Sequence, residues 1–400
     1  MIVIVGTGAG GGILARELAK NGEKVTIIEK GAYVDTKDAF KYYNKYVPDI
    51  DLLATTCVGG STIVSMANMV RALDEELHEY GIDLSDEYEY VEELVGVHEL
   101  DDSHIGRGTQ LFLDAAAELG LNVSKMPKAI REEDCIQCGK CAFGCPVNAK
   151  WTARDFVDEA IEAGAELIIN AEVKDIILCN LEACGVKYVK DGKEFLIKTE
   201  KIVLCAGAVE SAAILKRSGL TGVGRELFMD PFVTVGGYLK DINFNTEVQM
   251  AGLVVGRNFV LSPHFSSFIN DDMERLEDKD ILSIMVKTRD DAKGFVHTDG
   301  FLQKVNTIDD IRLLAEGVAT AGFILEKAGV DPNTICSTVY RGAHPGGTAK
   351  IGKIVDSNLE TEIPNLYVCD ASVLPIAPGK PPILTILALS KRLADYLLKK

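Results

Sequence analysis

The sequence predicts a mixed fold, α/β in its first part and α+β overall, and three observations support this prediction. Residues 2–5 form an apolar run that precedes a glycine-rich turn, a helical stretch and a second apolar run at residues 25–28, which is the order of a parallel βαβ unit. Residues 166–205 are rich in strand-forming residues and contain a Lys-Asp-Gly-Lys turn, as antiparallel strands do. A chain of 400 residues also favours two domains.

Composition and charge exclude several classes of protein. The formal net charge of -18 would repel nucleic-acid phosphates, so we expect no nucleic-acid partner. No run approaches the roughly 18 apolar residues that span a bilayer, and no secretory leader precedes the first strand, so we expect no membrane span and a cytoplasmic location. In that compartment the ten cysteines are expected to be metal ligands and core residues, not disulfides.

The N-terminal unit carries the signature of a dinucleotide site. Gly6, Gly8 and Gly11 form G-x-G-x-x-G: the first permits the tight turn, the second lets the backbone approach a pyrophosphate, and the third lets helix and strand pack closely. Glu29 ends the second strand, where a carboxylate accepts hydrogen bonds from ribose hydroxyls. The N–H groups at the start of the helix complete the phosphate site. This unit alone leaves NAD and FAD open.

A second strand that ends in an acid lies near the end of the sequence and favours FAD. Residues 365–370 are strand-like and end at Asp370, and a proline-rich loop and a long helix at about residues 383–398 follow. A second strand–acid element so far along the chain is expected when one cofactor stretches across the fold, as FAD does.

Four cysteines stand close together in the middle of the sequence. Cys135, Cys138, Cys141 and Cys145 have the C-x2-C-x2-C-x3-C-P spacing of bacterial ferredoxins, which wraps an iron–sulfur cluster from one loop, here residues 133–150. Structural zinc is the alternative, but zinc sites usually pair two cysteine knuckles across a longer stretch. We expect a [4Fe–4S] cluster closed by Cys145, or a three-cysteine [3Fe–4S] form. Such a cluster passes electrons singly, which predicts a protein electron donor or acceptor.

Six motifs in order resemble the glucose–methanol–choline (GMC) family of FAD oxidoreductases. They lie at residues 6–11 with Glu29, and at residues 59–62, 206–211, 223–227, 344–352 and 368–375. Many members of this family also carry the cysteine stretch, which here spans residues 135–150. The resemblance covers most of the chain, and six motifs in the family's order are far more specific than any one of them.

The resemblance implies a discontinuous, Rossmann-like FAD-binding domain that wraps around a mainly antiparallel substrate domain. Residues 1–225 and 344–400 would build the first, and residues 226–343 the second. The last helix would point its N-terminus at the flavin, where its partial positive charge stabilises the reduced ring. The residues expected to bind the cofactor are Gly6, Gly8, Gly11, Glu29, Gly59, Gly60, Ser61, Val173, Ala206, Gly207, Asp370, Ala371 and Thr385.

His344 is the predicted catalytic residue. It is the only one of six histidines in a Gly/Pro-rich loop between apolar elements, and the resemblance gives it the role of moving the substrate hydroxyl proton. The family usually places a second His or Asn opposite, but the matching position holds Pro381, whose side chain cannot hydrogen-bond. The neighbouring Lys380 is the candidate for the missing polar group, and a solvated surface lysine is the alternative.

Together these features predict an FAD- and iron–sulfur-dependent dehydrogenase. It would transfer a hydride between the CH–OH group of a small molecule and flavin, with the cluster relaying electrons to or from a protein partner. Two alternatives stay open: a reductase of a carbonyl or C=C bond fed through the cluster, and a non-catalytic electron-transfer subunit with a vestigial pocket. An open pocket between the two domains would favour the two enzymatic interpretations.

Overall fold

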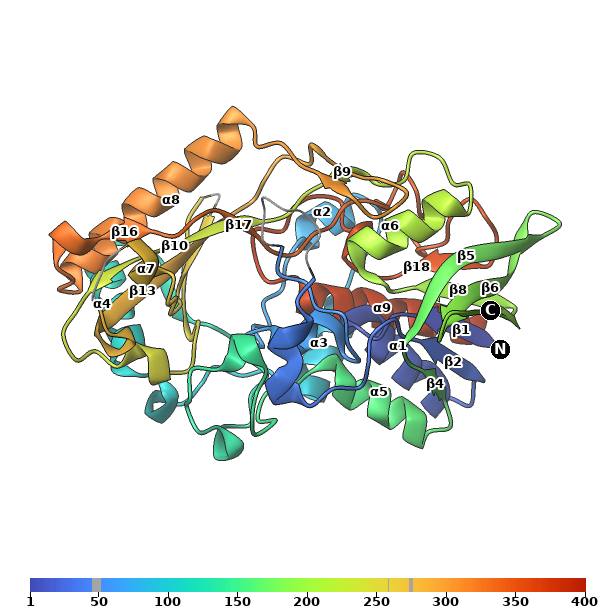
Figure 1. Ribbon diagram of the computed structural model, residues 1–400, viewed down its shortest axis with the longest axis horizontal. Coiled ribbons are helices and arrows are strands. Elements are labelled where there is room, and N and C mark those ends of the chain that lie inside the picture. Colours follow the sequence, from blue (N-terminus) through green and yellow to red (C-terminus); the bar gives the residue numbers. More distant parts are fainter. Residues whose placement is uncertain (45–51, 258, 273–275) are drawn as a thin grey trace.

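A five-stranded parallel sheet forms the centre of the cofactor half in the computed structural model, which describes residues 1–44, 52–257, 259–272 and 276–400 (Figure 1). β1 lies between β2 and β8, with Ile2 opposite Val25 and Lys201. All four residues of β1 are buried, as expected for a strand covered on both faces. The strand order is β18 (Leu366–Val368), β8 (Lys201–Leu204), β1 (Ile2–Val5), β2 (Val25–Ile28) and β4 (Glu166–Ile168).

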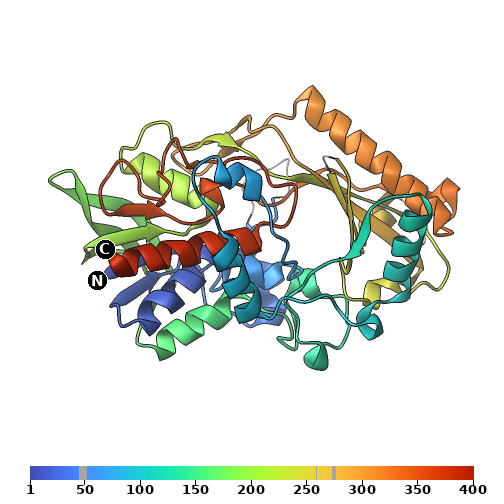
Figure 2. The ribbon, with the colours of Figure 1, turned by 180° about the vertical axis from the view of Figure 1, so that it is seen from behind.

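α1 packs on this sheet and is flanked by two further helices, and α6 lies apart from them. α1 lies between α5 and α9 in both views of the ribbon, and α9 also packs against α3 (Figures 1 and 2). α6 packs instead against β5 of a small antiparallel sheet. The helices are α1 (Ala9–Lys20), α3 (Ser85–Val95), α5 (Ala153–Glu162), α6 (Gly207–Arg217) and α9 (Ile383–Lys399).

A seven-stranded sheet forms the centre of the other half, and its pairings are antiparallel, as predicted. α8 (Ile308–Lys327) and α4 (Arg107–Glu118) pack on it, and Thr307 caps α8 through a capping box with Asp310. The strands are β16 (Cys336–Ser337), β10 (Pro231–Tyr238), β13 (Ile281–Thr288), β12 (Phe259–Pro263), β11 (Gly252–Val255) and β3 (Val123–Lys125), with β17 (Arg341–Gly342) beside β10.

The boundary between the halves differs from the expected one at residue 225. β3 pairs with β11, and Val123 lies opposite Val254. The apolar face of α4, including Phe112 and Ala116, enters the core of the antiparallel half. Residues 107–125 therefore belong structurally to the second half, because strand pairing and burial, which a short local pattern does not specify, decide their place.

One expectation about the cysteines is wrong. Cys179 and Cys184 form a disulfide, with their Cα atoms 5.8 Å apart. They lie across the turn that joins β5 (Ala171–Cys179) to β6 (Glu182–Lys190), and this close approach falls within the usual range for a disulfide. Cys205 and Cys369 are buried free thiols, as expected for packing residues. The predicted Lys-Asp-Gly-Lys turn joins β6 to β7 (Lys193–Lys198).

Short elements complete the two halves. In the part of the chain that the structure describes, none of the helices combines the length and the apolar character that crossing a membrane requires. The remaining strands and helices are β9 (Arg225–Leu227), β14 (Gly294–Val296), β15 (Leu302–Gln303), α2 (Asp74–His78) and α7 (Ile269–Asp272).

Candidate active site

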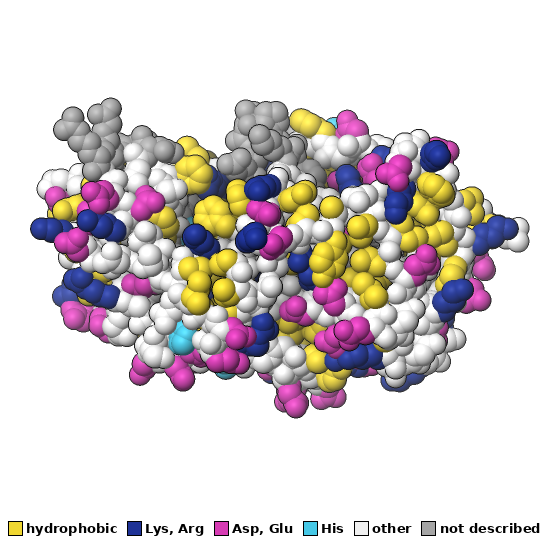
Figure 3. All heavy atoms as spheres, turned by 60° about the horizontal axis from the view of Figure 1, so that its bottom comes forward, with side chains coloured by type: hydrophobic (Ala, Val, Ile, Leu, Met, Phe, Trp, Pro, Cys, Tyr) yellow, Lys and Arg dark blue, Asp and Glu magenta, His cyan; other side chains and the backbone are white. Residues whose placement is uncertain are grey.

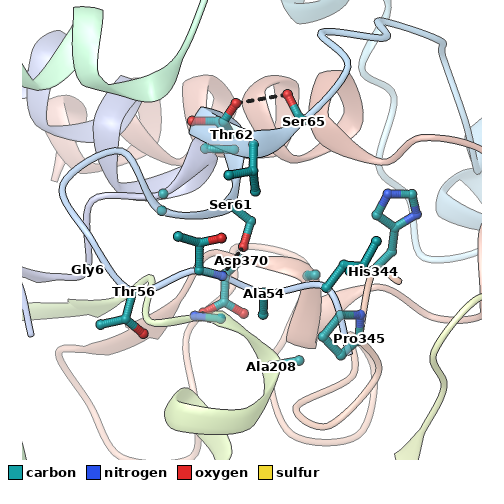
Figure 4. A pocket seen from close by; sticks show the side chains of 18 of the residues that line it. Gly6, Ala54, Thr56, Ser61, Thr62, Ser65, Ala208, His344, Pro345 and Asp370 are labelled. Atoms are coloured by element: carbon teal, nitrogen blue, oxygen red, sulfur yellow. Dashed lines mark hydrogen bonds between the residues drawn. The ribbon is translucent and has the colours of Figure 1, made fainter. Parts of the chain in front are cut away.

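A cavity of about 350 Å³ lies where the two halves meet, at the carboxyl ends of the parallel strands. Its walls come from the turns after β1, β2 and β8, the loop after β18 and residues of the antiparallel sheet. Figure 4 shows His344 and Pro345 on one side of the cavity, and Gly6 and Thr56 on the other. Open α/β sheets bind ligands at this edge, so the position favours a binding site.

The glycine-rich turn after β1 has the geometry that the sequence predicts. Gly6 has a φ of +101°, and a Cβ there would lie 2.4 Å from the Cys205 carbonyl oxygen. A Cβ on Gly11 would lie 2.0 Å from the Gly6 carbonyl oxygen, so Gly11 serves close packing and does not line the cavity. Gly8 does line the cavity, and a Cβ there would meet no protein atom within 4 Å. This open space at the N-terminus of α1 fits a pyrophosphate.

Glu29 is buried at the end of β2 and lines the cavity. Its Oε2 accepts hydrogen bonds from the Thr7 N–H (3.0 Å) and the Thr7 hydroxyl (2.5 Å), and Oε1 accepts one from the Gly31 N–H (2.7 Å). Burial raises the pKa of Glu29, although these hydrogen bonds oppose the rise. The carboxylate is thus held in place at the position where a ribose contact is predicted.

Asp370 joins the C-terminal strand element to the turn after β8. Its Oδ2 accepts hydrogen bonds from the Gly207 N–H (2.9 Å) and the Ser211 hydroxyl (2.6 Å). Its Oδ1 accepts one from the Ser372 N–H (2.8 Å). The Asp370 side chain is therefore already occupied, and contact with a cofactor is left mainly to backbone groups around it.

The other predicted cofactor residues divide into two groups. Those that line the cavity are Gly60, Ser61, Val173, Ala206, Gly207 and Ala371. Gly59 and Thr385 do not: Gly59 donates its N–H to Thr7, and the Thr385 hydroxyl donates to the Ala72 carbonyl at 2.9 Å. The N-terminus of α9 nevertheless faces the cavity through Pro382, so a helix-dipole contact does not need Thr385.

Three titratable side chains meet at the His344 side of the cavity. The His344 Nδ1 atom lies 3.1 Å from Asp230 Oδ2 and 3.1 Å from Lys287 Nζ. The Lys287 ammonium lies 3.6 Å from the same carboxylate oxygen. Asp230 and Lys287 expose 0% and 3% of their side chains, whereas His344 exposes 29%. Burial, and then Lys287, lowers the pKa of His344 despite the opposing effect of Asp230.

Apolar side chains and a second histidine border this trio. The apolar residues are Phe232, Met250, Met285 and Ala343, with Leu53 and Met66 packed against them. His264 also lines the cavity, and its buried Nδ1 has no hydrogen-bond partner among the described residues. Burial lowers the pKa of His264 to about 4, so it is neutral near pH 7. This end of the cavity suits a carbon skeleton better than a phosphate.

Lys380 and Pro381, the two neighbours at the position of the expected second polar group, differ in their relation to the cavity. Pro381 lines the cavity, but Lys380 does not, so the role predicted for Lys380 has no support from the geometry. Lys287 is the lysine beside His344, and sequence reasoning missed it together with Asp230. The available signal was a single charged residue in the mainly apolar run ILSIMVKT, which forms β13 and is buried along its whole length. Asp230 gives no such signal and is brought to His344 only by folding.

The four cysteines lie in one loop as free thiols: Cys135, Cys138, Cys141 and Cys145. Burial raises the pKa of Cys135, and the other three thiols raise it further, so the four lie close enough to interact. In the described part of the chain, no three His, Cys, Asp or Glu side chains converge closely enough to hold a metal ion. The iron–sulfur cluster therefore stays a prediction.

The cysteine loop reaches the cavity. Ala142 lines the cavity, and its carbonyl accepts a hydrogen bond from the hydroxyl of Tyr43, another lining residue. A Cβ on Gly144 would lie 1.8 Å from the Thr36 carbonyl oxygen, so the loop packs tightly against the 3-10 helix η1 (Thr36–Tyr42). The predicted cluster site and the predicted flavin site are thus neighbours.

Two buried lysines bond to the cavity wall beside the cysteine loop. Lys128 is 0% exposed and donates to Asn68 Oδ1 at 2.6 Å, and Lys150 is 3% exposed and donates to the carbonyls of Ile63 (2.7 Å) and Ser65. Burial lowers the pKa of Lys128 to about 7 and that of Lys150 to about 8, while the neighbouring cysteine sulfurs oppose the change. Among the residues that the structure describes, no carboxylate forms an ion pair with either ammonium.

Two family models match the chain. Both are described as GMC oxidoreductase; the N-terminal one matches residues 45–262 and the C-terminal one residues 303–390. The chain belongs to the GMC oxidoreductase family. It is therefore an FAD-dependent oxidoreductase of the class that acts on CH–OH donors. Its fold is that of the GMC oxidoreductases.

Relatives and solved structures agree with this family. The uncharacterised protein MJ1450 of Methanocaldococcus jannaschii is 33% identical over 99% of both chains. The long-chain-alcohol oxidase FAO4B of Arabidopsis thaliana is 25% identical and covers 100% of this chain and 68% of its own. The crystal structure of pyridoxine 4-oxidase from Mesorbium loti superposes with a TM-score of 0.79 over 100% of this chain and 99% of that chain, at 18% identity. This last similarity shows the shared fold alone.

Proposed function

We propose that this GMC enzyme is a dehydrogenase of small, largely apolar alcohols that passes electrons from FAD through an iron–sulfur cluster to a protein partner. The observation that carries the first part is a single cavity in which the dinucleotide turn and His344 lie on opposite sides (Figure 4). An open cavity with titratable groups favours catalysis over a vestigial pocket.

The residues around the cavity fit FAD. The open space beside Gly8 and the fixed carboxylate of Glu29 match a pyrophosphate and a ribose. Residues at the N-termini of α1, α6 and α9 line the same cavity, and their partial positive charges favour phosphate and the reduced flavin. When bound there, FAD supplies the acceptor for the hydride of the substrate carbon.

His344 accepts the substrate hydroxyl proton in this proposal. Its lowered pKa keeps the imidazole neutral near pH 7, so a ring nitrogen has a lone pair available. A positioned base of this kind contributes about 10²–10⁴-fold to a rate. In the reverse direction the protonated ring returns the proton, so His344 serves the reductase alternative equally well.

The apolar residues beside His344 favour a substrate with a hydrocarbon body. Phe232, Met250 and Met285 face the same cavity as His344. Burying a side-chain-sized apolar group contributes about 1.5–3 kcal/mol, which gives such substrates an advantage over sugars. The relatives named long-chain-alcohol oxidases are in keeping with this substrate class.

The charge around the cysteine loop supports the iron–sulfur cluster. Removing Lys128 and Lys150 from water costs several kcal/mol each unless a negative charge compensates. Neutral thiols supply no such charge, whereas cysteines that ligate a metal are thiolates. The Ala149 N–H also donates to the Cys145 sulfur at 3.2 Å, a contact of the kind that tunes cluster potentials.

An exposed apolar surface surrounds the cysteine loop and supports a protein partner. The side chains that form it are Phe40, Tyr42, Ile136, Phe143 and Val147. Figure 3 brings the lower side of Figure 1 forward and shows hydrophobic groups there, interspersed with acidic and basic side chains. Clustered exposed apolar side chains commonly mark interaction sites, so a redox protein could dock next to the cluster.

Anaerobic purification followed by a substrate screen tests the proposal. We expect the denatured protein to release FAD and the native protein to contain iron and sulfide. A CH–OH substrate should bleach the flavin and then reduce an artificial one-electron acceptor. If only carbonyl or C=C compounds react, by reoxidising flavin that was reduced through the cluster, the enzyme is a reductase; if neither class reacts, the electron-transfer subunit is the better interpretation.

A further inference from the structure

The charged pair next to His344 is more deeply buried than a stabilising role requires. Asp230 and Lys287 expose 0% and 3% of their side chains and lie 3.6 Å apart. Taking such a pair out of water costs several kcal/mol per charge, and apolar residues of similar volume often stabilise a fold as well or better. Asp230 and His344 also adopt left-handed backbone conformations (φ 41° and 52°), which non-glycine residues adopt at an energetic cost, often at functional sites.

The hydrogen bonds of Asp230 determine which nitrogen of His344 carries hydrogen. Oδ1 accepts from the Gly379 N–H at 3.0 Å, which leaves Oδ2 facing His344 Nδ1 at 3.1 Å. Lys287 Nζ lies 3.6 Å from Oδ2, longer than a hydrogen bond. A buried carboxylate oxygen needs a donor, and Nδ1–H is the donor within reach. Hydrogen on Nδ1 leaves the Nε2 lone pair to accept a proton.

In this tautomer Lys287 keeps its ion pair with Asp230 Oδ2 at 3.6 Å, and among the described residues no acceptor remains within 3.5 Å of Nζ. Among the described residues, His344 Nδ1 is the hydrogen-bond partner of Nζ, and it cannot accept once it carries hydrogen. Lys287 lines the cavity. Its ammonium is therefore placed to donate to a substrate oxygen and to stabilise negative charge there as the hydroxyl proton leaves.

We propose that Lys287 supplies the second polar group of the reaction site and that Asp230 is the positioning residue for His344. The Lys287 ammonium binds the substrate oxygen, for which Pro381 offers no side-chain group, and Asp230 holds hydrogen on Nδ1. The substrate O–H bond breaks and its proton goes to Nε2. The hydrogen and both electrons of the C–H bond pass to the flavin, so the alcohol becomes a carbonyl. This inference rests on the proposed function and deepens it.

The tautomer of His344 can be measured without substrate. In protein labelled with 15N-histidine, His344→Ala identifies the His344 signal among six. We expect that signal to report Nδ1–H in the wild type. Asp230→Asn should move the hydrogen to Nε2, because the Gly379 N–H keeps the amide oxygen and turns the amide N–H groups toward Nδ1. A wild-type signal that reports Nε2–H overturns the role of Asp230.

Lys287→Met tests the ammonium, and Lys304→Met is its matched control. Lys304 belongs to a second buried pair, 2.8 Å from Asp290 Oδ2, and none of its hydrogen bonds involves His344. We expect Lys287→Met to slow flavin reduction by a CH–OH substrate by about 10²–10³-fold with FAD content unchanged. The NMR pH midpoint of His344 should rise, because a neighbouring positive charge is lost. Lys304→Met should change neither.

If Lys287→Met fails to fold, the double variant Asp230→Asn/Lys287→Met leaves no unpaired charge and should show the same loss. Flavin reduction at the wild-type rate in either variant overturns the inference. When His344→Ala is slow and Lys287→Met is fast, the inference fails and the proposed function stands. When His344→Ala is itself as fast as the wild type, the proposed function fails.

Discussion

The Tyr43 hydroxyl donates a hydrogen bond to the Ala142 carbonyl over 2.9 Å, and both residues line the cavity. Ala142 lies between Cys141 and Phe143 in the cysteine loop. This contact therefore fixes the loop that carries the proposed cluster to the wall of the proposed flavin site. In the proposed function, this contact would keep the two centres adjacent for the two one-electron transfers that follow each hydride transfer.

Gly8→Val should abolish FAD binding while the protein still folds. A Cβ at this position would meet no protein atom within 4 Å, so the added side chain enters the space that the pyrophosphate needs. Gly322→Val is the matched control, because a side chain there also enters open space, on α8 and outside the cavity. Absorbance of released FAD per chain checks the result. A Gly8→Val protein with full FAD content would contradict the predicted cofactor position.

His344→Ala should slow flavin reduction by about 10²–10⁴-fold, the usual contribution of a positioned base. In the wild type, the rate should rise with pH, because the neutral imidazole is the active form. The midpoint should lie below the ordinary value of about 6.5, since burial and Lys287 lower the pKa of His344. Stopped-flow measurements over pH 4–9 would detect it, and a midpoint above ~6.5 would speak against the site geometry.

Lys380→Met should leave the rate and its pH dependence unchanged. Lys380 does not line the cavity, although the adjacent Pro381 does. The same stopped-flow assay measures flavin reduction in Lys287→Met, so the contributions of the two lysines to the rate are compared directly. A large loss of flavin-reduction rate in Lys380→Met would indicate that Lys380, in the loop before α9, is the second polar group.

Replacing Cys138 and Cys141 by serine should remove iron and leave FAD bound. The double variant loses half of the four thiolates, whereas the dinucleotide turn lies in a separate part of the chain. Metal analysis and flavin absorbance of anaerobically prepared protein measure both cofactors. Stoichiometric zinc in the wild-type protein would instead indicate that the four cysteines form a structural zinc site.

Lys150→Met should move the reduction potential of the cluster to a more negative value. A buried positive charge stabilises the reduced cluster, which carries one more negative charge, so its removal makes reduction less favourable. Lys140→Met, an exposed lysine within the cysteine loop, is the control, because water and salt screen its charge. Redox titrations followed by electron paramagnetic resonance measure both variants. If the Lys150→Met and Lys140→Met variants have equal reduction potentials, the Lys150 charge does not act on the cluster.

The cofactor half could be predicted from the sequence because its signals are local. The glycines of the first turn, the buried strand before them and the acid after β2 all act within about 30 residues, and Gly8 and Glu29 both line the cavity. The strand-like run that ends at Asp370 gave the distant element of this half, and β18 pairs in parallel with β8.

The His344 side of the cavity and the place of β3 depend on contacts between distant residues that no local pattern specifies. Asp230 and Lys287 precede His344 by 114 and 57 positions, and the pairing of β10 with β13 and β17 brings the three together. The same holds for β3, which joins a sheet built from residues more than 100 positions later. The resemblance implies that Thr385 contacts the cofactor, but its hydroxyl donates to the Ala72 carbonyl and Thr385 does not line the cavity.

The parallel sheet joins β1, β2, β4 and β8 to β18, which lies near the end of the sequence, and this bears on how the chain folds during synthesis. β1 and β8 are made early, but β18 and α9, which complete the dinucleotide site, follow residue 365. The strands β11, β12 and β13 pair between close neighbours and have their partners as soon as residue 288 emerges from the ribosome. These antiparallel pairs therefore have their partners before β18 and α9 can complete the parallel sheet, and the proposed FAD site needs both the early and the late segments.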